Sequence, residues 1–501
     1  MEFSIAPLRP VTREFLAIVL AGFGNELVPL SGDLGNQPCP KALLPISNKP
    51  MIDYVLSWIE KSGIKGQGTR PFTVLSDPLA RPLRCYLDVL LICPPSHRPS
   101  ISHFIYSESL ASSPSLCIDL QTFDDSQGLS VGTCSVLRHF SSRIKEDFVI
   151  LPCDFIPPPS LPLSKLLNKF RIETMSDGAI VTTCWFEPPS GKTTVPEEWG
   201  TNSQATPIVW DNSTGTLLYV DTLDNTDRNP EEVELRMSLL CRYPRTNMSS
   251  KLQDSHVYVC KRQVLGVLQQ KGDFESLRED FFPWLCKLQY QKTRQLKYGN
   301  VLGNLEGSEP SSPDEGHEDP SVTGSLRVGI VIHRAKDGFC IRANDLPSYL
   351  EANRHFVDSA SSYTLPSDPQ MRSLIDAKAS ISPDSIIGDF TKVDERASIK
   401  KSVIGKHCVV GKMAKIVGCV ILDHCVIADG AKLESSILGK NTRVGSKATL
   451  VHCVTQGGYE VKDNESYRNE RLDITDWEAE ADEEREEDDD EAFGDSDEES
   501  G

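Results

Sequence analysis

The sequence lacks the features that would place it among membrane, secreted or zinc-binding proteins. No apolar run approaches the roughly 20 residues that span a bilayer. The run near the start, 15–22, follows the acidic Glu14 and is too short for a secretory signal or an anchor. The 15 cysteines are odd in number and include no C-x-x-C pair, which argues against a disulfide framework and a zinc site. We therefore expect the thiols to be reduced and mostly buried, and we expect no metal site. The protein should be located in the cytoplasm, in the cytosol.

We expect no basic face either, although the net charge of −20 conceals how charge is distributed. Residues 473–501 hold 17 acidic residues and one Arg, so the other 472 residues carry a net charge of only −4. A body this close to neutral gives no reason to expect nucleic acid as a direct ligand.

The acidic residues gather in 459–501, which we interpret as a disordered tail. Trp477 and Phe493 interrupt the acid, and such a mixture can also dock on a basic partner. A solvating arm and a docking segment both remain open.

What is present indicates about three units in 501 residues of ordinary globular composition. The apolar run Phe15–Leu20 is typical of a buried strand and ends at Gly22 and Gly24. A helix is predicted from Met51 to Lys61, and further buried strands at 89–93 and 148–151. A hairpin is predicted at 208–220, and helices at 261–270 and 276–289. Strands and helices in this order predict an α/β domain over 14–300.

Three segments do not fit that domain. The stretch 66–88 is rich in Pro and Arg and is either an atypical insertion or an artefact of the gene model. The stretch 301–325 has the Gly, Ser, Pro and acidic composition of a disordered linker. We expect 326–375 to connect the linker to the last domain.

A 17-residue repeat then predicts a left-handed parallel β-helix over 376–458. The period divides as 6 + 6 + 5, which gives three short strands per coil, and about four coils run from Ile386 to Val454. Four series of aliphatic residues recur with this 17-residue period: Ile387, Ile404, Ile421 and Leu438; Val393, Val410, Ile427 and Val444; Ile399, Ile416, Leu433 and Leu450; Val403, Val420, Ile437 and Val454. Two series of small residues accompany them: Ala397, Ala414, Ala431 and Ala448; Thr391, Cys408, Cys425 and Thr442.

Two features could carry phosphate chemistry. Gly22 and Gly24 follow the first strand, where missing Cβ atoms let backbone N–H groups approach a phosphate, with Lys41 as a counter-charge. Asp154 follows the predicted strand at 148–151, where open α/β sheets place ligand groups and where an Asp could hold Mg²⁺. A tight turn at the glycines and a cap at Asp154 are equally open interpretations.

His407 and His424 are 17 residues apart and should stack on adjacent coils. The third position is Asn441, so a metal or acyl-transfer role is not sustained and a solvated corner is the better interpretation. Cys408 and Cys425, together with Cys419 and Cys453, are expected to be packing residues.

Together these residues resemble the sugar-phosphate nucleotidyltransferases, in which such an α/β domain precedes a left-handed β-helix. The shared opening motif is Pro40-Lys41-Ala-Leu-Leu-Pro45-Ile-x-Asn48-Lys-Pro50. Within that superfamily the chain is most similar to the gamma subunits of eukaryotic translation initiation factor 2B. Four stretches carry the closer likeness: 132–138 with 151–155, 254–258, 342–354 and 398–405.

The resemblance implies a degenerate active site. Active pyrophosphorylases follow the glycines with an Arg that offsets triphosphate charge, whereas this chain has Asn25-Glu26-Leu27. A carboxylate about 5 Å from a phosphate costs roughly 3 kcal/mol at an effective dielectric constant near 20. Gly22, Gly24, Lys41 and Asp154 would then be a remnant nucleotide pocket, with no catalytic residues, no required cofactor and at most residual binding of GTP or a sugar nucleotide.

The resemblance further implies a non-catalytic structural and regulatory subunit. It would pair with the epsilon subunit and join the alpha, beta and delta subunits in the factor that promotes GDP-to-GTP exchange on initiation factor 2. In the family a helical carboxy-terminal domain of epsilon carries exchange, and we expect none here. The alternative is a mannose-1-phosphate guanylyltransferase that makes GDP-mannose. A β-helix acyltransferase is disfavoured by the broken histidine series.

Overall fold

The computed structural model describes residues 14–32, 38–62, 89–109, 116–123, 132–189, 199, 206–222, 233, 235–303, 326–359 and 373–473. The chain forms two compact units. The first comprises the chain up to Gly22, Met51–Ser190 and Ser203–Arg342, and the second comprises Phe23–Pro50, Gly191–Asn202 and Ala343–Gly501. The predicted insertion 66–88, residues 304–325 of the predicted linker 301–325 and the acidic residues from 474 onward lie outside the described residues. Residues 301–303 of that linker form the end of helix α10 (Lys292–Gly303), contrary to the prediction.

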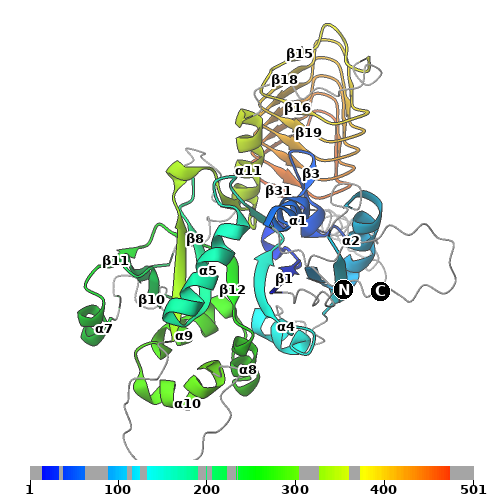
Figure 1. The fold of residues 1–501 in the computed structure, drawn as a ribbon. Coiled ribbons are helices and arrows are strands. Elements are labelled where there is room, and N and C mark those ends of the chain that lie inside the picture. The colour runs from blue at the N-terminus through cyan, green and yellow to red at the C-terminus, as the bar shows by residue number, and fades with distance from the viewer. Residues whose placement is uncertain are drawn as a thin grey trace, which may run out of the picture. The chain divides into compact units, whose positions relative to one another are not determined.

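The first unit is built on a mixed sheet of ten strands, and this confirms the predicted α/β class (Figure 1). In spatial order the strands are β11 (Thr246–Ser249), β9 (Ile208–Asp211), β10 (Thr216–Val220), β13 (Arg327–His333), β8 (Ala179–Phe186), β12 (Gln253–Cys260), β6 (Asp147–Pro152), β1 (Phe15–Leu20), β4 (Val89–Cys93) and β5 (Ile118–Thr122). Strands β6, β1, β4 and β5 run parallel, whereas β12 is antiparallel to β6 and β8.

Helices pack on both faces of this sheet because its strands are apolar on both sides. Leu16 and Ile18 of β1 join a buried core that α4, α8 and α9 complete, while Phe15 meets Phe170 of α5 with ring centroids 5.9 Å apart. The helices of the unit are α1 (Met51–Ser62), α2 (Arg98–Phe104), α4 (Thr133–Phe140), α5 (Leu163–Asp177), α7 (Met237–Arg242), α8 (Gln263–Gln270), α9 (Phe282–Leu288) and α10 (Lys292–Gly303). Short helical turns are η3 (Pro95–His97), η4 (Ile105–Ser109), η6 (Leu277–Phe281) and η7 (Ala335–Asp337).

The segment after the predicted linker differs from the connecting role expected for 326–375. Its first residues form β13, which pairs in parallel with β8 along Arg327–His333 inside the sheet. The buried run from Val328 to Val331 provides the apolar surface that a central strand needs. The α/β unit therefore takes a strand from beyond residue 300, which local composition does not reveal.

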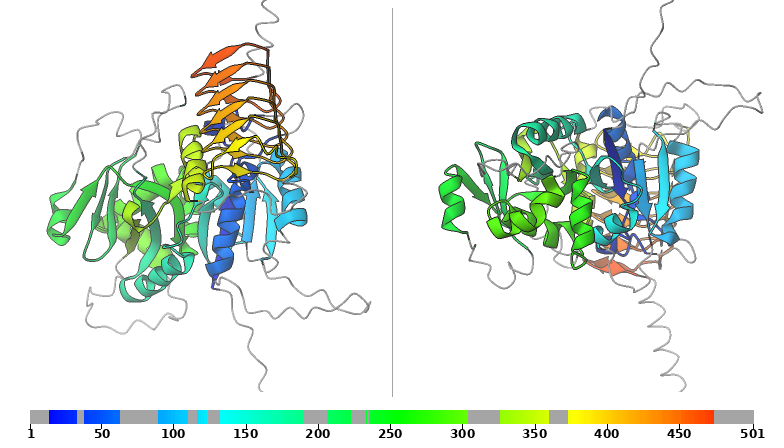
Figure 2. Two further views of the ribbon diagram at one scale, coloured as in Figure 1. Left: turned by 90° about the horizontal axis from the view of Figure 1, so that it is seen from above. Right: turned by 60° about the horizontal axis from the view of Figure 1, so that its bottom comes forward.

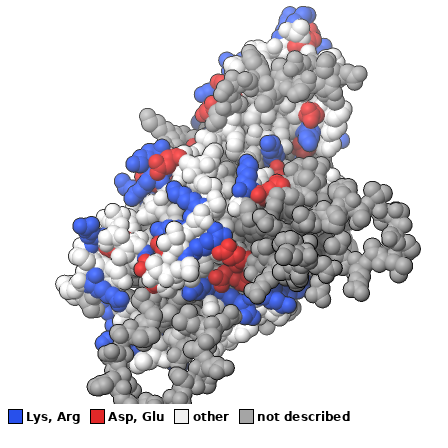
Figure 3. All heavy atoms as spheres, in the orientation of Figure 1, with Lys and Arg blue, Asp and Glu red and all other residues white. Residues whose placement is uncertain are grey.

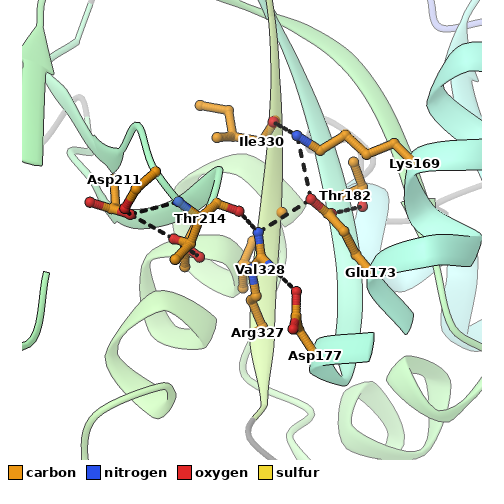
Figure 4. Close-up of polar contacts among 12 residues, drawn as sticks. Lys169, Glu173, Asp177, Thr182, Asp211, Thr214, Arg327, Val328 and Ile330 are labelled. Carbon is orange, nitrogen blue, oxygen red and sulfur yellow. Dashed lines mark hydrogen bonds and ion pairs between the residues drawn. The ribbon is translucent and has the colours of Figure 1, made fainter. Parts of the chain in front are cut away.

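A buried ion pair fixes β13 against α5 (Figure 4). The Arg327 guanidinium lies 3.2 Å from the Glu173 carboxylate, and it also contacts Asp177 and the carbonyl of Thr214. Lys169 donates to the carbonyl of Ile330 at 2.7 Å. Because a charge removed from water needs a partner, these contacts let charged side chains sit within the fold.

The second unit is dominated by a parallel β-helix, which confirms the prediction from the 17-residue period (Figure 2). One wall holds β15 (Ser380–Ile381), β18 (Ser398–Lys400), β21 (Lys415–Val417), β24 (Lys432–Glu434), β27 (Thr449–Val451) and β30 (Ser466–Arg468). A second holds β16 (Ile386–Ile387), β19 (Val403–Ile404), β22 (Val420–Ile421), β25 (Ile437–Leu438), β28 (Val454–Thr455) and β31 (Arg471–Leu472). The third holds β17 (Lys392–Val393), β20 (Val409–Val410), β23 (Val426–Ile427), β26 (Arg443–Val444) and β29 (Glu460–Val461).

One ladder of small residues has a second role besides packing. Thr391 Oγ1 donates to the carbonyl of Gly405 at 2.7 Å, and Cys408 Sγ to that of Leu422 at 3.2 Å. Cys425 and Thr442 make the same bond one coil and two coils further on. Each side chain thus satisfies a buried backbone carbonyl of the following coil, which explains why Thr and Cys share the position. Cys419 and Cys453 are buried, as predicted.

The β-helix continues to Leu472, beyond the predicted boundary at 458 and into the segment expected to be tail. β29, β30 and β31 add to the three walls, and Val461 and Leu472 remain in the core. The sequence period is hard to see there because Tyr459 and Tyr467 replace small or aliphatic residues, while the outward positions are charged.

We predict that Gly329→Ala destabilises the first unit by about 2 kcal/mol, because the new Cβ would collide with Glu173 and lie 2.9 Å from Thr182 Oγ1. Gly299→Ala in α10 is the control, since a Cβ there meets nothing within 4 Å. Urea unfolding of both variants tests this. Equal unfolding midpoints would contradict the packing described for β13.

We predict that Thr442→Val destabilises the β-helix by about 1 to 3 kcal/mol, because the buried carbonyls of Gly439 and Gln456 lose the hydroxyl that they share as a donor. Thr449→Val in β27, at a partly exposed position, should change stability by less than about 0.5 kcal/mol. Thermal unfolding followed by circular dichroism measures both. A stable Thr442→Val protein would show that the ladder is packing alone.

Candidate functional site

The first unit brings Gly22 and Asp154 to the same edge of the sheet. They follow β1 and β6, which are parallel neighbours with Leu20 opposite Pro152. The amide of Cys153 donates to the carbonyl of Leu20 at 3.1 Å, so the two loops leave the sheet together. This edge is where the carboxyl ends of parallel strands place ligand groups, as the sequence predicted.

Asp154 is bound by an arginine of the same unit. Its side chain is 1% exposed, and its Oδ1 accepts a hydrogen bond from Arg342 Nε at 3.0 Å. Strand β14 (Ile341–Arg342) pairs with β7 (Phe155–Ile156) and thereby delivers the guanidinium. Burial lowers the pKa of Arg342, but the Asp154 carboxylate outweighs it, so that the pKa rises above its ordinary value. The guanidinium supplies the positive charge that a cation would otherwise bring to this carboxylate.

A second buried carboxylate lies close to the same guanidinium. Asp254, in β12, accepts from the Tyr258 hydroxyl at 2.7 Å and lies 3.5 Å from Arg278 Nε. Burial raises the pKa of Asp254, although Arg278 and Arg342 both act to lower it. Burial and the neighbouring Asp254 raise the pKa of Tyr258 well above its ordinary value. Two aspartates, two arginines and a tyrosine thus form one charge cluster.

Arg278 is itself held from several sides. It donates to the carbonyl of Asp221 at 2.8 Å and to the hydroxyl of Thr206, and it lies over the Trp185 ring at 5.3 Å. These contacts fix the guanidinium within the fold, so we assign it a structural part in the cluster.

Gly24 and Lys41 belong to the second unit. Gly24 has a φ of +86°, and a Cβ added there would lie 2.8 Å from the Lys41 Cβ, so this position requires glycine. Lys41 opens the turn η2 (Lys41–Leu43), is 5% exposed, and donates through Nζ to Asn344 Oδ1. The predicted phosphate lysine therefore has an amide of the chain as its partner. Glu26, in η1 (Asn25–Leu27), is exposed.

Helix α11 (Leu346–Ser359) holds the loop that carries Lys41. The Tyr349 hydroxyl donates to the carbonyl of Pro45 at 2.5 Å, and Asn353 Oδ1 accepts from the amide of Ser47 at 2.9 Å. These contacts fix the hairpin of β2 (Pro45–Ile46) and β3 (Lys49–Pro50). The segment 342–354, known from the sequence only as a family likeness, thus contacts both predicted ligand groups: Asp154 through Arg342 and Lys41 through Asn344.

Sequence reasoning missed Arg342, Asn344, Asp254 and Arg278 as site residues. The signal was present, because 254–258 and 342–354 were two of the stretches that carried the family likeness. What the sequence could not show is the pairing, since Arg342 is 188 residues from Asp154. The structure pairs Gly22 with Asp154 in one unit and Gly24 with Lys41 in the other.

Other candidate groups do not add a site. His407 and His424 stack with centroids 5.0 Å apart, and Phe390 stacks on His407 at 4.8 Å. Both histidines are exposed and lie at turn positions with positive φ, which fits the predicted solvated corner.

Across the described residues, no group of three or more His, Cys, Asp or Glu side chains is placed to hold a metal ion. In the same part of the chain, no helix is both long and apolar enough to cross a membrane.

Known proteins resemble the chain over most of its length. Residues 370–466 match the family described as the eIF2B subunit epsilon LbH domain, a left-handed β-helix. Translation initiation factor eIF2B subunit gamma of Schizosaccharomyces pombe is 30% identical over 395 residues, which are 78% of this chain and 74% of that protein. The subunit of the same name from Dictyostelium discoideum is 22% identical over 79% of this chain and 88% of its own length. The subunit of the same name from Caenorhabditis elegans is 27% identical over 57% of this chain and 61% of its own length. The chain therefore belongs to the family of eIF2B gamma subunits.

Proposed function

We propose that this chain is a non-catalytic structural and regulatory subunit of translation initiation factor 2B, the factor that promotes GDP-to-GTP exchange on initiation factor 2. Its membership of the gamma-subunit family supports the place in that factor. Its two units, a nucleotidyltransferase-like α/β unit and a β-helix, would serve as rigid surfaces for assembly, which then controls translation initiation.

The proposal that the chain is non-catalytic rests on the contacts made by the segment Arg342-Ala-Asn344. Within the first unit Arg342 binds Asp154, the carboxylate expected to hold Mg²⁺, and within the second unit Asn344 binds Lys41, the cation expected to meet phosphate. A ligand at either group would have to displace a contact that the folded chain already makes. Such pre-formed partners favour a stable fold over turnover, because the groups are not free to stabilise a transition state.

Glu26 adds an electrostatic reason. Active pyrophosphorylases have a cation after the glycine loop, and here a carboxylate stands there and would repel a triphosphate. We therefore propose that the chain needs no cofactor. Gly22, Gly24, Lys41 and Asp154 would be a remnant with at most weak binding of GTP or a sugar nucleotide.

We further propose that the epsilon subunit is the direct partner and that the alpha, beta and delta subunits complete the assembly in the cytosol. The match of this β-helix to a domain described for epsilon supports a common architecture in the two chains. Chains of like architecture can pair through equivalent surfaces. No direct contact with nucleic acid or membrane is part of this proposal, and nothing in the relatives or the fold favours the guanylyltransferase alternative.

We predict that the tagged chain recovers the epsilon subunit from native extract at equimolar ratio, together with the other three subunits and initiation factor 2. Quantitative mass spectrometry of the eluate measures the stoichiometry. A variant truncated after Asp473 should recover the same set, because we expect the two described units to carry the assembly surfaces. Recovery of the chain without epsilon would refute the proposed partnership.

We predict that the full chain releases no pyrophosphate above background from GTP and mannose 1-phosphate in the presence of Mg²⁺, because Arg342 and Asn344 hold the two groups that catalysis would need. A coupled phosphate assay with an active guanylyltransferase as positive control measures this. Mg²⁺-dependent turnover that disappears in an Asp154→Asn variant would establish the enzyme alternative instead.

A further inference from the structure

A cavity lined by none of the residues Gly22, Gly24, Lys41 and Asp154 lies in the first unit beside β10, α9 and α10. Its volume is about 570 Å³, within the usual range for small-molecule sites. Tyr219 and Tyr290 line it together with Gln291, and three cations join them: Arg236, Lys287 and Arg294. Val233 and Leu235 supply its apolar lining. Both tyrosines also pack against a small buried cluster of Val209, Leu218 and Leu239.

The three cations are not neutralised by the described part of the chain. Among the described residues, no carboxylate forms an ion pair with Arg236, Lys287 or Arg294. This differs from Arg278, Arg327 and Arg342 of the same unit, each of which has an acidic partner. Cations gathered around one cavity repel each other, and an anion bound among them would remove that repulsion.

The surroundings are also cationic. The stretches 235–253 and 281–303 contain four Lys or Arg residues each and no Asp or Glu. In Figure 3 the end of the first unit that carries β11 and α7 shows blue side chains and little red. The net charge of the 472 residues that precede the acidic tail is only −4, and this sum conceals the basic face because it combines all parts of the chain.

The aromatic groups define a second part of the cavity. The Arg236 guanidinium lies over the Tyr290 ring, 6.0 Å from its centroid, so a cation and an aromatic ring line the cavity together. Both tyrosines are partly exposed, and Gln291 brings an amide that can both donate and accept. A flat heterocycle can stack on such a ring while its phosphates meet the cations.

We propose that this cavity binds a nucleoside di- or triphosphate. Arg236, Lys287 and Arg294 would hold the phosphates, Tyr290 would stack on the base, and Gln291 would meet its polar edge. The site shares no residue with the remnant pocket around Gly22, Gly24, Lys41 and Asp154. It would let the chain sense nucleotide without performing chemistry on it.

Calorimetry with the full chain at physiological salt tests the proposal, with GTP, ATP and inorganic triphosphate as probes. Binding of at least one nucleotide is expected, and it should weaken about tenfold or more in Arg236→Ala/Arg294→Ala. The charge-matched control Lys292→Ala/Lys297→Ala removes two exposed cations of α10 that do not line the cavity and should bind nearly as wild type. Thermal unfolding of both double variants confirms that they fold.

Two further variants separate the parts of the site. Tyr290→Leu should weaken nucleotide binding but leave the weaker binding of inorganic triphosphate unchanged, because only the nucleotide uses the ring. Lys41→Met should keep the nucleotide binding that Arg236→Ala/Arg294→Ala loses, even where weak binding at the remnant groups falls, which distinguishes this cavity from them.

Several results would overturn the proposal. One is the absence of nucleotide binding to the wild-type chain, as expected if the neighbouring Glu231, Glu232 and Glu234, which lie outside the described residues, neutralise the cations. Another is binding that is lost in Lys41→Met and kept in the double arginine variant. A third is capture of a synthetic acidic peptide of sequence 476–501 in place of nucleotide, which would make the cavity a peptide site.

Discussion

A carboxylate buried away from water needs a positive partner or hydrogen-bond donors, and the first unit depends on the arginines that meet this need. Glu173 is paired with Arg327, Asp254 with Arg278, and Asp154 with Arg342. The first pair holds β13 in the sheet. Asp154 lies at the sheet edge where the carboxyl ends of parallel strands place ligand groups, and there an arginine of the chain meets the same requirement. Asp154 and Asp254 are thus committed to contacts within the first unit.

The sequence was informative where the signal is local or periodic. The apolar runs at Phe15–Leu20 and Val89–Cys93 predicted buried strands, and the 17-residue period predicted the β-helix, because stacked coils repeat the same packing environment. Asp154 was expected after a buried strand, because the apolar run at 148–151 that precedes it is also a local signal. Long-range pairings gave no such signal: nothing near Arg342 or Asn344 indicates that their partners are Asp154 and Lys41, and nothing near Arg327 marks β13 as a strand of the sheet.

The family gives these contacts their meaning. Relatives named as eIF2B gamma subunits share most of the chain, and the matched β-helix carries the description of the epsilon subunit. We interpret the nucleotidyltransferase-like fold as an assembly element. In it Arg342 forms an ion pair with Asp154, and Asn344 accepts a hydrogen bond from Lys41. Regulation would then come from surfaces and from the basic cavity around Tyr290.

We propose that Asp154 has a structural partner and no part in nucleotide exchange. The GDP-release rate of initiation factor 2, measured with a complex rebuilt around the variant Asp154→Asn/Arg342→Gln, tests this, because the variant removes both charges together and leaves neither one unpaired. We expect a release rate equal to that of the wild-type complex at equal subunit stoichiometry. A rate about tenfold lower in a fully assembled complex would contradict it.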